Sequence, residues 1–124
     1  MRGKTTDKLV VLATHGPEDQ ERATFPFVMA NAALAMETEA VVILQGAGVL
    51  LAQKGVYAHV FAGGLPALQG LLETFLRTGG KLLVCTPCVK ARKLEPSMLV
   101  DGAELVAGAR AIQEATTASA VLSY

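Results

Sequence analysis

Two cysteines separated by two residues are the groups in this sequence best suited to chemistry. Cys85 and Cys88 are the only cysteines of the chain, and Pro87 lies between them. An apolar run precedes the pair and a short basic segment follows it. The thiolate is the reactive form of cysteine, and nearby positive charge stabilises it. The pattern therefore indicates sulfur or redox chemistry.

Cys85 is the first candidate nucleophile, one that attacks a sulfur atom or accepts sulfane sulfur as a persulfide. Pro87 pre-sets a helical φ, so a turn over 87–92 would aim free N–H groups and the positive end of its dipole toward Cys85. Arg92 and Lys93 would add positive charge. Cys88 lies farther inside that turn, so we expect Cys85 to be the more reactive thiol. The structural alternative is a small apolar residue ending a buried strand.

Cys88 admits further interpretations. The two thiols could cycle through a disulfide, as in Cys-x-x-Cys redox proteins. They could also form half of a zinc site, completed by His15 and His59, the only histidines of the chain. A lone Cys-x-x-Cys is a weak metal signal, and we predict no metal.

Residues that follow the other strands are candidates for substrate binding. His15 comes after the first apolar run and Gln45 after the second, so both are expected at the same sheet edge as Cys85. His15 could orient a substrate or carry a proton; alternatively it is a loop residue that hydrogen-bonds backbone groups. With Arg92 and Lys93 they complete the predicted binding set. Leu51 stands where a dinucleotide fingerprint needs its third glycine, and we predict no cofactor.

Composition excludes several classes of function. The chain has 124 residues with 11 basic and 11 acidic side chains, so it lacks the positive charge that nucleic-acid binding requires. No apolar run is long enough to cross a membrane. Residues 1–8 lack a signal-peptide pattern, and we expect a cytoplasmic protein with reduced cysteines. Hydrophobic residues make up 52% of this small chain, which favours a homo-oligomer.

Apolar runs alternate with helical segments along the chain, which is typical of βαβ units and a mainly parallel sheet. We expect a single three-layer α/β/α domain over residues 1–124, with about five mostly parallel strands. The region 56–64 is predicted as loop with a short strand. Pro26 is placed in the first turn of the first helix. The predicted strands are 9–13, 41–44, 81–84, 103–106 and 120–122. The predicted helices are 25–37, 49–52, one that starts at Pro66, carries an apolar stripe over 68–76 and stops at Gly79 or Gly80, and 108–116.

Several of these segments together resemble the DsrE/DsrF-like family, which includes the TusD-type sulfur-relay proteins. The most specific match is the segment 85–92, followed by 99–105. The segments 11–16, 21–23, 48–49 and 54–55 are similar to the family's first strand and loop, its first helix and the region after its second strand.

The resemblance implies a flavodoxin-like α/β/α subunit, usually assembled as a trimer or hexamer. In sulfur-relay members the persulfide-carrying cysteine lies seven residues before an arginine, and Cys85 has that spacing from Arg92. Cys88 would be an extra thiol found in a subset, and Lys93 replaces the family's glycine. The implied partners are a sulfur donor and an acceptor protein. Three functions remain: a sulfur relay on Cys85, a dithiol redox protein, and a non-catalytic ligand-binding or scaffold module.

Overall fold

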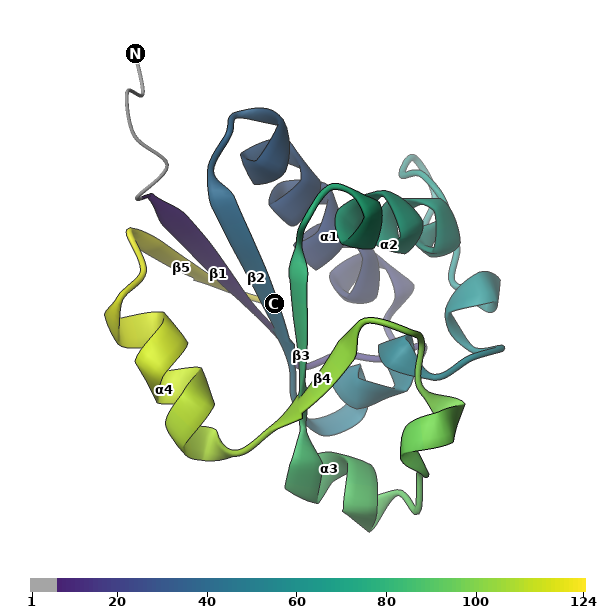
Figure 1. The fold of residues 1–124 in the computed structure, drawn as a ribbon. Helices are drawn as coiled ribbons and strands as arrows, with labels where there is room; N and C mark the ends of the chain where they lie inside the picture. Colours follow the sequence, from purple (N-terminus) through teal and green to yellow (C-terminus); the bar gives the residue numbers. More distant parts are fainter. Residues whose placement is uncertain (1–6) are drawn as a thin grey trace.

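Five apolar runs pair side by side into one sheet in the computed structural model, which describes residues 7–124 (Figure 1). Residues 1–6, which belong to the segment interpreted above as lacking a signal-peptide pattern, lie outside the described residues. The strands are β1 (Lys8–Ala13), β2 (Glu39–Leu44), β3 (Lys81–Cys85), β4 (Ala103–Val106) and β5 (Ala120–Ser123). All four pairings are parallel, and the strand order is β4-β3-β2-β1-β5. The predicted α/β class is confirmed.

Helices occupy both faces of the sheet (Figure 1). They are α1 (Gln20–Ala35), α2 (Leu68–Arg77), α3 (Thr86–Ala91) and α4 (Gly108–Thr116), with 3₁₀ turns η1 (Gly46–Ala52), η2 (Tyr57–His59) and η3 (Pro96–Met98). The chain steps in one direction from β1 to β4, then returns past β1 to β5. Because parallel crossovers are right-handed, this reversal places α4 on the face opposite α1 and α2.

The strand order differs from that of flavodoxin. Flavodoxin follows 2-1-3-4-5, whereas the order here is 4-3-2-1-5. The expected likeness to flavodoxin therefore holds for the parallel sheet and the helical layers but not for the strand order. That order could not be read from the sequence, since it depends on contacts between distant segments.

Side-chain alternation along β3 decides which face Cys85 occupies. Leu82 and Val84 are buried in the core beneath α1 and α2, whereas Leu83 is buried in the smaller core beneath α4. Successive strand residues point to opposite faces. Cys85 has the same parity as Leu83, so this register directs it toward the α4 face.

The first helix begins earlier than predicted. Asp19 caps α1 by accepting a hydrogen bond from the backbone N–H of Arg22, so the helix starts at Gln20. Pro26 therefore lies inside the helix and not in its first turn. Proline removes one helical hydrogen bond. Burial of Phe27 and Ala30 in the core offsets this loss, because tertiary packing outweighs local propensity.

Two further predictions concern the region 56–64 and the end of α2. The short strand predicted within 56–64 is absent, and the turn η2 is found there instead. Gly79 ends α2 as predicted, with φ +98 and the backbone N–H of Gly80 donating to the carbonyl of Phe75 over 2.8 Å. Every helix within residues 7–124 falls short of the length and apolar character needed to cross a bilayer.

Candidate functional site

The two cysteines meet at the carboxyl edge of the sheet. Cys85 is the last residue of β3 and the N-cap of α3, and Cys88 is the third residue of that helix. Both are half-buried. Their sulfur atoms are paired as a disulfide, with Cα atoms 5.3 Å apart. Reversible thiol–disulfide chemistry is therefore open to this pair without movement of the backbone.

Cys88 also contacts the segment that follows β2. The backbone N–H of Gly46 donates a hydrogen bond to Cys88 Sγ over 3.2 Å. Gly46 has φ +55, a conformation that glycine adopts without strain. A hydrogen bond to sulfur favours the anionic form of a thiol. This contact could not be predicted from the sequence, because it joins residues that are 42 positions apart.

A small pocket lies beside Cys85 on the α4 face. It is formed where β2, β3 and β4 end and α4 begins, and Gln45 lines it together with Cys85. The rest of the lining is apolar, including Ile43, Val106 and Ala111. Its volume of about 20 Å³ is close to that of one water-sized group. Both cysteines pack against the larger core, but only Cys85 also lines this pocket.

Backbone contacts hold the loops at this edge in place. The hydroxyl of Thr86 donates to the carbonyl of Val106 over 2.9 Å, which ties the start of α3 to the end of β4. Gln45 N–H donates to the carbonyl of Ala13 over 3.0 Å. A Cβ atom at Gly48 would overlap that same Ala13 carbonyl, so η1 can lie this close to β1 only with glycine there.

His15 is at the same edge but does not line the pocket. Its Nδ1 atom lies 3.4 Å from the hydroxyl of Thr14. The pKa of Asp19 is lowered, first by the backbone N–H of Arg22 and least by the charge of His15. Within residues 7–124, no three histidine, cysteine or acidic side chains gather as a metal site would require. The Cys₂His₂ arrangement considered above is therefore not formed in this part of the chain.

Arg92 and Lys93 end α3. Arg92 is exposed, and its Nη1 donates to the carbonyl of Cys88 over 3.2 Å. Lys93 has φ +57, and its N–H donates to the carbonyl of Lys90 while Leu94 N–H donates to that of Val89. These are the paired bonds of a Schellman motif. Lysine therefore adopts the left-handed conformation that glycine would favour, and the turn forms despite the substitution.

The crevice between β1 and β5, where the strand order reverses, is filled by the chain itself. The N–H and hydroxyl of Thr14 both donate to the carbonyl of Tyr124, each over 2.9 Å. The ring of Tyr124 stacks on that of Phe25, with centroids 6.0 Å apart. Ligands of open α/β sheets often bind at such a reversal. Here the cysteine pair lies at β3, away from it.

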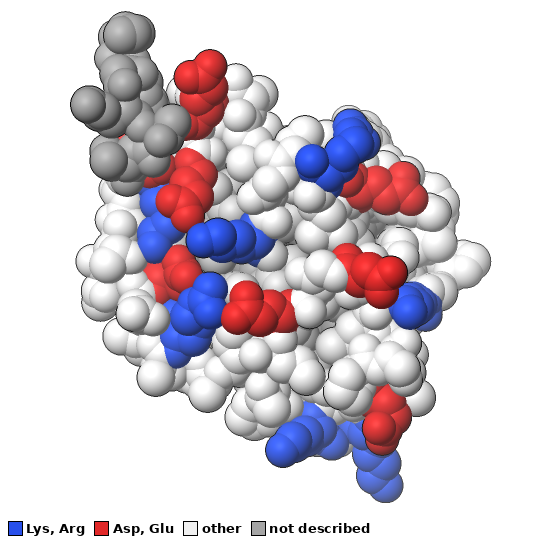
Figure 2. Space-filling model, in the orientation of Figure 1, with Lys and Arg blue, Asp and Glu red and all other residues white. Residues whose placement is uncertain are grey.

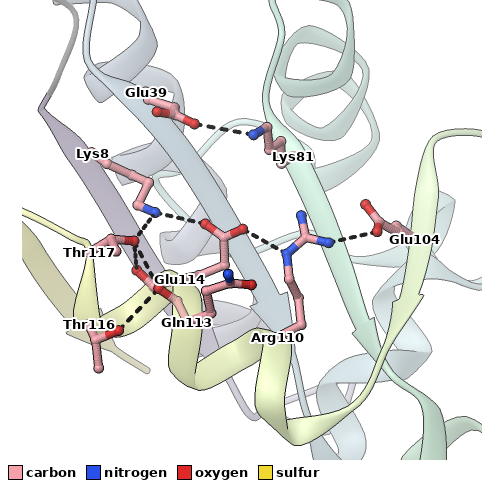
Figure 3. A network of polar contacts seen from close by, with 9 residues as sticks. All are labelled: Lys8, Glu39, Lys81, Glu104, Arg110, Gln113, Glu114, Thr116 and Thr117. Atoms are coloured by element: carbon pink, nitrogen blue, oxygen red, sulfur yellow. Dashed lines mark hydrogen bonds and ion pairs between the residues drawn. The ribbon is translucent and has the colours of Figure 1, made fainter.

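A second polar cluster on the α4 face was missed by the sequence analysis. Acidic and basic side chains are interspersed beside α4 (Figure 2). Glu114 of α4 accepts hydrogen bonds from Lys8 Nζ at 2.9 Å and Arg110 Nε at 2.8 Å, and Arg110 Nη1 also donates to Glu104 (Figure 3). Burial raises the pKa of Glu114, but the hydrogen bonds from Lys8 and Arg110 outweigh it and the pKa is lowered. The i,i+4 spacing of Arg110 and Glu114 was the one available signal.

Comparison with known proteins places this architecture in a family. The family model described as DsrE/DsrF-like matches residues 7–124. The chain belongs to the DsrE/DsrF-like family. The resemblance stated from the sequence is thereby confirmed.

Proteins similar in sequence to this chain include two uncharacterized ones. Over 83% of its length the chain is 33% identical to the uncharacterized protein MJ0760 of Methanocaldococcus jannaschii, and it spans only 37% of that protein. Over 80% of its length it is 32% identical to the uncharacterized protein MK0008 of Methanopyrus kandleri, of which it spans 78%.

Solved structures share the fold. The ychN protein of E. coli superposes with a TM-score of 0.80 at 22% identity, covering 95% of this chain and 99% of that one. The protein of unknown function MTH1491 from Methanobacterium thermoautotrophicum superposes with a TM-score of 0.77 at 14% identity, with the same coverage. These similarities establish the architecture.

Proposed function

We propose that this protein carries sulfane sulfur as a persulfide on Cys85. The observation that supports the proposal most directly is the place of Cys85, a half-buried thiol that ends β3 and lines a pocket of atomic size. Membership of the DsrE/DsrF-like family adds to it. The Cys85 thiolate attacks the outer sulfur of a donor persulfide, forming a new S–S bond while the donor leaves as its thiolate. A partner protein then accepts the sulfur.

The surroundings of Cys85 suit this role. The pocket walls are largely apolar, and Gln45 is the polar side chain beside them. A persulfide sulfur bound there would be shielded from other thiols in solution, and shielding of this kind slows exchange. Arg92 lies exposed at the end of α3, where its charge would attract an anionic donor.

Loading of the Cys88→Ser variant tests the proposal. This variant keeps Cys85 but cannot form the disulfide, so the reduced protein incubated with a persulfide donor should gain one sulfur atom, about 32 Da by mass spectrometry. Peptide mapping should place the added sulfur on Cys85. The Cys85→Ser variant is the matched control and should load more slowly, with any added sulfur mapping to Cys88. Absence of loading in Cys88→Ser, with its fold retained by circular dichroism, would contradict the proposal.

A dithiol redox function is the second candidate, favoured by the pairing of Cys85 with Cys88. A redox cycle needs both thiols, whereas persulfide loading needs only Cys85. The Cys88→Ser variant therefore separates the two: a redox protein loses all activity, and a sulfur carrier still loads. A non-catalytic binding or scaffold module predicts that neither thiol reacts near neutral pH.

We also propose that the protein works as a homo-oligomer, a trimer or hexamer. Large apolar side chains remain exposed on the isolated chain, among them Ile112 at 64% and Val121 at 45%. Contacts between copies would bury such surface. Light scattering should give a multiple of 12.9 kDa. The monomer mass at micromolar concentration would refute this proposal.

A further inference from the structure

We infer that Cys88 resolves the persulfide on Cys85 and releases its outer sulfur as hydrogen sulfide. The inference rests on the proposed persulfide carrier and adds an activity to it. The substrates are sulfane-sulfur compounds, such as persulfides and polysulfides, and the product is sulfide. The chain thereby reduces sulfane sulfur whenever no acceptor protein takes it.

The first supporting observation is the contact between the two sulfur atoms. Cys88 Sγ reaches Cys85 Sγ in the disulfide pairing, with Cys85 as the N-cap of α3 and Cys88 in its first turn. A thiol held against another sulfur reacts within the chain, so the reaction does not wait for a collision with an external thiol. A persulfide formed on Cys85 therefore has a nucleophile beside its inner sulfur from the moment it forms.

The second observation is the hydrogen bond that Cys88 receives. Gly46 N–H donates to Cys88 Sγ over 3.2 Å, and no sulfur bond of this kind is found for Cys85 among the described residues. Hydrogen bonding to the charged form stabilises a thiolate. Cys88 is thus prepared to act as the attacking thiolate after Cys85 has been loaded.

The third observation concerns the sides of Cys85 Sγ on which the attacking sulfur and the outer sulfur lie. Cys85 lines the pocket on the α4 face, whereas Cys88 contacts η1 through Gly46 and is absent from that lining. In a thiolate displacement at sulfur, the attacking sulfur approaches from the side opposite the sulfur that leaves. The pocket beside Cys85 and Ala107 would hold the outer sulfur on one side of Cys85 Sγ. Cys88 would approach Cys85 Sγ from a different side, so the outer sulfur is free to leave.

The Cys88 thiolate attacks the inner sulfur, Cys85 Sγ, and forms the Cys85–Cys88 disulfide. The bond between Cys85 Sγ and the outer sulfur breaks, and the outer sulfur leaves with the electron pair as HS⁻. The two cysteine sulfurs are oxidised to the disulfide, and the sulfane sulfur is reduced to sulfide. A dithiol reductant, small or protein-borne, returns both cysteines to thiols for the next cycle.

A single-turnover experiment without oxygen tests this inference. Fully reduced wild-type protein and Cys88→Ser each receive one equivalent of glutathione persulfide, the reductant having been removed beforehand. The wild type should release about one sulfide per chain, at least about tenfold faster than Cys88→Ser, because its attacking thiol is intramolecular. Its mass should fall by about 2 Da relative to the dithiol, since two thiol hydrogens are lost. Cys88→Ser should keep the added sulfur.

The rate of release distinguishes an intramolecular step from exchange between chains. It should not change when the protein concentration is varied, because Cys88 attacks its own chain. The inference is overturned if wild-type protein holds its added sulfur as long as Cys88→Ser does, or if sulfide appears without the disulfide. Failure of Cys88→Ser to load would instead refute the persulfide proposal. The two failures are therefore distinguishable.

Discussion

The backbone N–H of Gly46 donates a hydrogen bond to the sulfur of Cys88 across 42 residues of sequence. This contact joins the segment after β2 to the helix after β3, and it places a hydrogen-bond donor on one thiol of the pair. Cys85 lies beside an apolar pocket instead. Both cysteines pack against the larger core, but only Cys88 receives the Gly46 hydrogen bond and only Cys85 lines the pocket. This difference is compatible with the proposed division into carrier and resolving cysteine.

Substitution of Gly46 should weaken the resolving step. Gly46 and Gly55 have φ +55 and +88, so alanine at either site should cost about 1 kcal/mol of stability. Only Gly46 holds the N–H that contacts Cys88, so backbone strain in Gly46→Ala should weaken this hydrogen bond and only this variant should release sulfide more slowly. Urea unfolding measures the loss of stability, and the single-turnover assay measures the rate of sulfide release. Equal release rates in both variants would show that the hydrogen bond does not assist Cys88.

Close approach of η1 to β1 should make Gly48 sensitive to substitution. A Cβ there would overlap the Ala13 carbonyl, and backbone on both sides cannot yield. We expect Gly48→Ala to destabilise the protein by about 1 to 3 kcal/mol. Gly70→Ala, in the exposed first part of α2 with open space around it, should instead stabilise by up to about 1 kcal/mol. Chemical unfolding under reducing conditions compares the stability of the two variants. A Gly48→Ala variant as stable as the wild type would disprove the close approach of η1 to β1.

The turn after α3 should become more stable with glycine. Lys93 has φ +57 in its Schellman motif, and Glu37 has φ +62 in the same motif after α1. Lys93→Gly and Glu37→Gly should each gain about 0.5 to 1 kcal/mol, because glycine adopts this conformation without a Cβ penalty. Only Lys93→Gly removes a positive charge beside the cysteine helix. If that charge stabilises the Cys85 thiolate, loading should slow in Lys93→Gly alone.

The ion pairs of Glu114 should make stability depend on pH. The lowered pKa means that ionised Glu114 stabilises the fold fully above its unfolded-state pKa, and that this stability is lost as the pH falls through the lower folded-state pKa. Glu114→Gln should cost about 1 to 2 kcal/mol near pH 7, a value discounted for partial access of water. The difference in the free energy of unfolding between the wild type and Glu114→Gln should shrink in acid.

Glu39→Gln is the matched control, because Glu39 pairs with Lys81 at 3.3 Å with both side chains at least 40% exposed. Such a surface pair contributes little, so this variant should change stability by less than about 0.5 kcal/mol. Urea unfolding at a series of acidic pH values measures the stability of both variants and of the wild type. A gap between wild type and Glu114→Gln that stays constant in acid would contradict the assigned ion pairs.

Local sequence pattern was enough to predict the five strands and the helix α2. The apolar runs around Val10, Val42 and Leu83 became β1, β2 and β3, and the stripe from Leu68 to Phe75 became α2. These predictions succeeded because residues close in sequence determine periodicity. The start of α1 was misplaced because burial of the segment around Pro26 outweighed its local helix penalty.

Spacing alone also identified the cysteine pair as the candidate site, since residues three apart at the start of a helix must lie close together. The sequence could not show which side chains surround the pair. Gly46, Val106 and Ala111 reach it only because the strand order 4-3-2-1-5 places β2 and β4 on either side of β3. The same order puts α4 on the second face, where Glu114 meets Lys8. Local sequence determined most of the elements and the closeness of the two cysteines; the tertiary structure decided their neighbours, because those contacts join residues far apart in the chain.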